Sequence, residues 1–123
     1  MHELSIASAI VEKIVEFAAG KDIAKVVEIR LAVGELSCIE PEQLRFCISS
    51  ISRETVMEDS TVEIENVAAE VRCPHCEYAG PPKYWDDALS ASRIPTLQCP
   101  ECGKAAEALQ GEDCSIRTIR YAA

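Results

Sequence analysis

Two matched pairs of cysteines constrain the fold of this chain more than any other feature of its sequence. The pairs are Cys73-Pro-His-Cys76 and Cys99-Pro-Glu-Cys102, and the 22 residues 77–98 separate them. Two residues between paired cysteines let one tight turn present both sulfurs to a single ion, and two facing turns complete a tetrahedron. Four thiolates occupy every position around Zn(II), so such a site is structural. We therefore expect one structural Zn(II) per chain, bound by Cys73, Cys76, Cys99 and Cys102.

Two other chemistries use cysteines at this spacing. A redox dithiol needs one pair beside a thioredoxin-like unit, whereas this chain has two matched pairs. An iron–sulfur cluster also takes four cysteines, but two distant matched pairs fit zinc better. His75 lies inside the first pair as an alternative ligand, although an exposed side chain is the simpler expectation. The other three cysteines have no motif around them: we expect Cys47 to be a small core residue, and Cys38 and Cys114 to have no metal role.

The segment that carries the cysteine pairs has no convincing run of aliphatic residues, so hydrophobic burial alone cannot give it a core. A structural zinc is worth about 10–16 kcal/mol in zinc-finger peptides, which is enough to hold such a segment. We predict a zinc-binding domain at residues 71–111, inserted into a domain of residues 1–70 plus 112–123. The aromatic, proline-bearing residues 80–87 are expected to pack over the cysteine turns or to form a docking surface.

An amphipathic helix is predicted near the start of the chain. Apolar residues recur at helical spacing over residues 5–19, at Ile6, Ile10, Ile14 and Phe17. Ser5 is a suitable N-cap and Gly20 a suitable C-terminal stop. This prediction leaves residues 1–4 outside the helix.

Three alternating runs, residues 25–33, 61–67 and 115–121, predict strands. The apolar face of the first run contains Val27, Ile29, Leu31 and Val33. A second helix is predicted to begin at Pro41, after a turn at residues 34–37. Its apolar stripe consists of Leu44, Cys47, Ile48 and Ile51. The elements predict an α+β fold with two helices on a three-stranded sheet and a zinc-ribbon-like domain inserted before the last strand.

Composition excludes several classes of function. The chain has 123 residues, with 12 basic and 21 acidic side chains and a formal charge of -9, which argues against a nucleic-acid partner. Residues 1–20 have no basic start, and charges interrupt their apolar residues, so we expect no signal peptide, no membrane span and a reducing, cytoplasmic location. No nucleophile–base pair, phosphate loop or open zinc position is recognisable, so we expect that the protein is not an enzyme.

The tripeptide Met1-His2-Glu3 offers a second metal site. A free α-amino group, the amide nitrogen of His2 and its imidazole can form adjacent chelate rings around one ion, if Met1 is the true terminus. Nitrogen ligands in a plane suit Ni(II) or Cu(II). The amide nitrogen or the carboxylate of Glu3 would be the fourth donor. On the tripeptide alone, an exposed histidine without a role is the simpler interpretation.

The sequence resembles the HypA/HybF family over essentially its whole length. The resemblance rests on the opening residues Met1-His2-Glu3-Leu4-Ser5, on the stretch from Leu31 to Cys38 and on the two cysteine pairs. Members are nickel metallochaperones of nickel–iron hydrogenase maturation. The resemblance implies transient Ni(II) at Met1, His2 and Glu3 and Zn(II) at the four paired cysteines. It also implies two partners, a HypB-type GTPase and the hydrogenase large subunit.

Two hypotheses of function follow. The first is a non-catalytic carrier that binds Ni(II) at its amino terminus and passes it to a partner. The alternative is a zinc-ribbon adaptor that binds other proteins and has no nickel role. The two differ in metal content, because the adaptor holds zinc alone.

Overall fold

The computed structural model describes residues 2–86 and 93–122, and the chain forms two compact units. The first comprises Met1–Ala32, Ile39–Glu65 and Ser115–Ala123. The second comprises Val33–Cys38 and Asn66–Cys114. The domain bounds expected from the sequence, 1–70 plus 112–123 and 71–111, stay a prediction.

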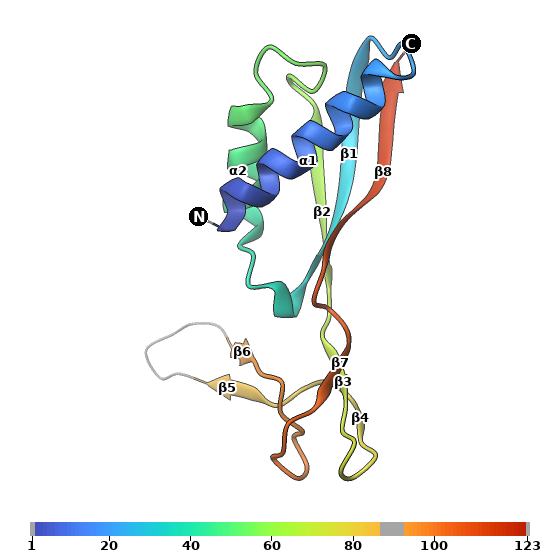
Figure 1. Ribbon diagram of the computed structural model, residues 1–123. Helices are drawn as coiled ribbons and strands as arrows, with labels where there is room; N and C mark the ends of the chain where they lie inside the picture. The colour runs from blue at the N-terminus through green and yellow to red at the C-terminus, as the bar shows by residue number, and fades with distance from the viewer. Residues whose placement is uncertain (1, 87–92, 123) are drawn as a thin grey trace. The chain divides into compact units, whose positions relative to one another are not determined.

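The first unit contains two helices and one sheet (Figure 1). The helices are α1 (His2–Ala19) and α2 (Pro41–Ile51). The sheet has the order β2 (Thr61–Val67), β1 (Lys25–Gly34) and β8 (Cys114–Ala122), so that β1 is central. Pro41 occupies the first turn of α2, as predicted. The α+β fold with two helices and a three-stranded sheet is therefore confirmed.

The core of the first unit lies between the helices and the sheet. Burying one aliphatic side chain is worth about 1.5–3 kcal/mol, and this core has many of them. Its helical members are Ala7, Ile10, Val11, Ile14, Ala18, Leu44, Cys47 and Ile48, and the members from β1 include Val26, Ile29, Leu31 and Ala32. Cys47 is thus a core residue, as expected. Neither of the two helices that the structure describes is long and apolar enough to cross a membrane.

The start of α1 differs from the prediction. The helix begins at His2, so the expected cap at Ser5 is wrong and the first turn includes Glu3. An acidic side chain in the first turn is favourable because the helix N-terminus carries a partial positive charge. The Glu3 carboxylate also accepts a hydrogen bond from the backbone N–H of Glu40, at 3.1 Å. These interactions extend the helix toward the amino terminus, past Ser5, which local capping preference selects as the N-cap.

The first strand also departs from simple alternation. Ile29, Leu31 and Val33 are buried as predicted, but Val27 is 39% exposed and Val26 is buried in its place. The backbone N–H of Val26 donates to the carbonyl of Val56, at 2.9 Å. The start of β1 is thus bound to the segment after α2, and the predicted inward position of Val27 is wrong.

The second unit consists of short strands. Strand β3 (Glu70–Arg72) pairs antiparallel with β4 (Ala79–Gly80) and with β7 (Glu107–Gln110). A separate ribbon is formed by β5 (Tyr84–Asp86) and β6 (Arg93–Pro95). The short 3-10 helix Glu35–Ser37 belongs to the same unit. No sequence signal predicted these strands, because each has only two to four residues.

Two glycines of the second unit lie in contact. A Cβ added at Gly34 would lie 2.1 Å from the carbonyl oxygen of Gly111. Two backbone hydrogen bonds close the same contact: Gly34 N–H donates to the Asp113 carbonyl at 2.9 Å, and Leu36 N–H donates to the Gly111 carbonyl at 2.7 Å. The chain therefore needs glycine at position 34 for space.

We predict that Gly34→Ala lowers the free energy of unfolding by about 2 kcal/mol or more, because the methyl group has only backbone to displace. Gly20→Ala is the matched control, since its nearest neighbour would lie at 3.7 Å, and we expect a change within about 0.5 kcal/mol. Urea unfolding of both variants measures the difference. Equal midpoints would contradict the steric argument.

Candidate metal centre

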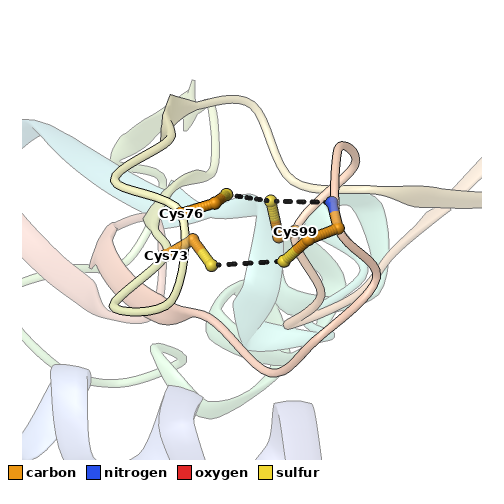
Figure 2. A group of neighbouring side chains, drawn as sticks. Cys73, Cys76 and Cys99 are labelled. Atoms are coloured by element: carbon orange, nitrogen blue, oxygen red, sulfur yellow. Dashed lines mark hydrogen bonds between the residues drawn. The ribbon is translucent and has the colours of Figure 1, made fainter.

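The first cysteine pair forms a tight turn directly after β3. Two backbone hydrogen bonds close it: Cys73 N–H donates to the Tyr78 carbonyl at 2.8 Å, and Glu77 N–H donates to the Cys73 carbonyl at 3.0 Å. Glu77 has a positive φ of 64°, which reverses the chain toward β4. The turn thereby places the sulfurs of Cys73 and Cys76 on one side (Figure 2).

The second pair repeats this geometry. Cys99 N–H donates to the Lys104 carbonyl, and Gly103 N–H donates to the Cys99 carbonyl, both at 2.9 Å. Gly103 has a φ of 76° and so occupies the position that Glu77 occupies in the first turn. The amides of Glu101 and Cys102 point at the Cys99 sulfur, at 3.4 and 3.5 Å. Such amide donors stabilise a thiolate, which is the form that binds metal.

The two turns face each other and bring the four predicted cysteines together (Figure 2). All four sulfurs lie within 4.8 Å of one another. The closest pairs are Cys73 with Cys102 and Cys76 with Cys99, each at 3.5 Å. A tetrahedral ion with Zn–S bonds of about 2.3 Å needs sulfurs about 3.8 Å apart, so the cluster fits such an ion. The four cysteines could therefore hold a metal ion with no position left for water.

Burial and local donors differ among the four thiols. Cys73 and Cys99 are fully buried, whereas Cys76 and Cys102 are exposed. Burial raises the pKa of Cys73, but the backbone donors of His75 and Cys76 outweigh it and lower this pKa to about 7. The Tyr78 amide lowers the pKa of Cys76, but the neighbouring thiols, Cys99 first, raise it to about 12. The local contacts thus favour ionisation of Cys73 and oppose that of Cys76, and a bound cation would favour the thiolate form of Cys76 as well.

The remaining cysteines do not belong to this cluster. Cys38 is exposed, Cys47 is buried in the first unit, and burial raises the pKa of Cys114. His75 is exposed in the first turn, and among the described residues the cluster consists of the four cysteines alone. All seven cysteines are free of disulfides.

The aromatic stretch between the turns is held by a contact that the sequence did not predict. The Tyr84 hydroxyl donates to Glu35 Oε1 at 2.8 Å, and the same oxygen accepts from Ala69 N–H at 2.9 Å. Trp85 is 57% exposed, so more than half of this side chain is open to solvent, and both alternatives for residues 80–87 stay predictions. Asp87, the end of the stretch, lies outside the described residues. The residue after each cysteine pair has a positive φ. The sequence could indicate this only at Gly103, because glycine adopts positive φ readily and Glu77 gives no such signal.

The predicted terminal site is described in part. Met1 lies outside the described residues, and of His2 the structure describes the backbone at the start of α1. Glu3 lies in the first turn, and its Oε2 accepts from Glu40 N–H. Glu40 is the N-cap of α2, and its own carboxylate accepts from Gln43 N–H at 2.6 Å. The amino-terminal end of α1 is therefore bound to the start of α2.

Comparison with known proteins identifies the class as metallochaperones. The family described as "Hydrogenase/urease nickel incorporation, metallochaperone, hypA" matches residues 1–121. The hydrogenase maturation factor HypA of Methanopyrus kandleri is 33% identical over 133 aligned positions, covering 98% of this chain and 92% of that protein. HypA of Methanothermobacter thermautotrophicus is 32% identical over 125 positions, covering 98% and 96%.

Solved structures have the same fold. The solution structure of the Ni metallochaperone HypA from Helicobacter pylori has a TM-score of 0.66 at 20% identity, covering 98% of this chain and 97% of that chain. A solution structure of HypA protein has a TM-score of 0.68, also at 20% identity, covering 99% and 97%. The chain belongs to the HypA family of nickel-incorporation metallochaperones in hydrogenase maturation. This membership confirms the resemblance found in the sequence and the expectation that the protein is not an enzyme.

We predict that metal affinity of the cysteine cluster falls as pH falls, and that the fall steepens below about pH 7. Cys76 and Cys102, whose pKa values are raised, release a proton on binding throughout the neutral range. Cys73 is ionised above its pKa of about 7 and must release a proton only below it, so about one further proton is displaced there. Competition titrations with Zn(II) and a chelator between pH 6 and 8.5 measure the slope. A constant slope would contradict the assignment of Cys73.

Proposed function

We propose that this protein binds Ni(II) at Met1, His2 and Glu3 and delivers it during maturation of nickel–iron hydrogenase. The observation that carries the proposal is family membership over residues 1–121. In addition, the four-sulfur cluster leaves no open coordination position through which a bound ion could exchange. A cargo ion must be released, so it needs a separate, open site. The terminal amine, an amide nitrogen and the His2 imidazole provide donors of the kind that Ni(II) accepts in a plane.

The backbone of the first turn supports this assignment. The helix begins at His2, and the first N–H groups of a helix have no acceptor within it. A metal that displaces the proton from such an amide therefore breaks no helical hydrogen bond. The Glu3 amide lies in the same turn.

The four-cysteine cluster is proposed to hold one structural Zn(II) per chain. Its sulfur spacing fits a tetrahedral ion, and two of the few buried side chains in its unit are Cys73 and Cys99. Residues 71–111 would then be a zinc-binding domain inserted into residues 1–70 plus 112–123. The proposed partners are a HypB-type GTPase and the hydrogenase large subunit, and the proposed location is the cytoplasm, where thiols stay reduced.

The alternative function, a protein-binding adaptor without nickel, is favoured by one observation. Trp85 and Ile94 lie opposite each other in the β5–β6 ribbon and are 57% and 42% exposed. Cross-strand partners share one face, so the two side chains form an apolar surface. Metal content separates the two functions, because the adaptor holds zinc alone.

We predict that His2→Ala weakens Ni(II) binding by at least about tenfold, since it removes one ring of the chelate. One residue added before Met1 should weaken it comparably, because the terminal amine is displaced from the ring. Isothermal titration with Ni(II) measures both variants, after mass spectrometry has established that Met1 is the first residue of the wild type. His75→Ala is the matched control and should bind as the wild type does. Unchanged affinity in both terminal variants would overturn the nickel site.

We predict that Cys99→Ser reduces bound zinc from one per chain to nearly none and disorders the second unit, because the cluster replaces an apolar core there. Cys38→Ser, at an exposed cysteine outside the cluster, should keep its zinc. Metal analysis gives the stoichiometry, and amide exchange shows whether β3 and β7 lose protection while α1 and α2 keep it. Full protection of β3 in the metal-free Cys99→Ser protein would refute the structural role.

A further inference from the structure

The contact between Glu3 and Glu40 joins two segments 37 residues apart in the first unit. Glu3 Oε2 accepts from Glu40 N–H at 3.1 Å. That N–H belongs to the N-cap residue of α2, and Glu40 uses its own carboxylate to accept from Gln43 N–H at 2.6 Å. Glu40 thus makes two separate hydrogen bonds: its carboxylate caps α2, and its backbone N–H donates to Glu3 of α1. Figure 1 shows the amino-terminal end of α1 beside α2.

We infer that Glu3 is a positioning residue: its side chain holds the first turn of α1 against the cap of α2 and thereby orders the nickel-chelating terminus. The part of this inference that concerns nickel rests on the proposed function. The ends of helices fray because their last residues have few bonds to hold them. A hydrogen bond from the side chain of Glu3, the second residue of α1, to a separate helix opposes that fraying directly after Met1 and His2.

Ordering of the terminus raises the affinity of a chelate. The planar chelate proposed here needs its donors in one plane, and ordering them before binding reduces the entropy lost on binding. The hydrogen bond lies at the surface, so its effect is modest: we expect a change of about twofold to tenfold in affinity. A coordinating carboxylate would behave differently, because its replacement by an amide would remove a charged ligand.

Four single variants separate these roles. Glu3→Ala removes the acceptor, whereas Glu3→Gln keeps an oxygen that can accept the same bond. Glu40→Pro removes the donor together with the capping carboxylate, and Glu40→Ala removes the carboxylate alone, so it is the matched control. The backbone of Glu40 is extended, with φ −88° and ψ 115°, which is compatible with proline before Pro41.

Nickel titration should show about twofold to tenfold weaker binding in Glu3→Ala and in Glu40→Pro. Binding by Glu40→Ala should stay within about twofold of the wild type, and Glu3→Gln, which keeps an acceptor oxygen, should bind more tightly than Glu3→Ala. The double variant Glu3→Ala/Glu40→Pro should bind no more weakly than the weaker single variant, because both remove the same bond. Additive losses in the double variant, or a Glu3→Gln protein as weak as Glu3→Ala, would overturn the positioning role.

The bond itself can be tested without nickel. Hydrogen exchange at the Glu40 amide, followed by NMR on the full chain, should be faster in Glu3→Ala by about twofold to tenfold and unchanged in Glu3→Gln. An unchanged rate in Glu3→Ala would refute the tether even if nickel binding were lost. Conversely, wild-type protein that binds no nickel but shows the expected exchange pattern would refute the proposed function and leave the tether intact.

Discussion

The mutual approach of four cysteine sulfurs is the interaction on which the second unit depends. Apart from Cys73 and Cys99, the buried apolar side chains of this unit, among the described residues, are Val33, Ala69, Val71 and Pro82. Ordering each residue costs about 1–2 kcal/mol in backbone entropy, which so few aliphatic side chains cannot offset. An ion bound by four thiolates contributes about 10–16 kcal/mol in comparable small domains. The pairing of β3 with β4 and β7 is therefore best understood as a consequence of the cluster.

The rest of that unit is organised by contacts of the Glu35 carboxylate and of the Gly34 backbone. One carboxylate oxygen of Glu35 accepts from both Ala69 N–H and the Tyr84 hydroxyl, which links the start of β3 to the β5–β6 ribbon. Close to it, Gly34 lies against Gly111 with no room for a side chain. The cysteine turns and these contacts act on different parts of the unit, so a bound ion need not hold every strand directly. The ribbon can thus present Trp85 to solvent while its other face is fixed by Tyr84.

Sequence reasoning succeeded where spacing alone determines geometry. Two residues between paired cysteines define a turn, so the cluster could be predicted without any knowledge of the fold. It failed where contacts between residues distant in the sequence determine the local structure. The start of α1 depends on Glu40, and the inward position of Val26 depends on Val56, neither of which a local pattern contains. Strands of two to four residues have no periodicity to detect, and Glu35 finds its partners 34 and 49 residues away.

Selectivity for nickel cannot come from the proposed terminal donors alone. Nitrogen ligands bind Cu(II) more tightly than Ni(II), according to the general order of divalent ions. Net charge does not discriminate either, because a formal charge of -9 attracts any cation. The proposed Zn(II) with four thiolates would add -2 and bring the charge to roughly -11. A carrier with such a site must therefore obtain its specificity from the protein contacts through which the ion arrives and leaves. The ordering proposed for the terminus through Glu3 suits that requirement, because the hydrogen bond to Glu40 lies at the surface, where a partner can reach it and alter it at little energetic cost.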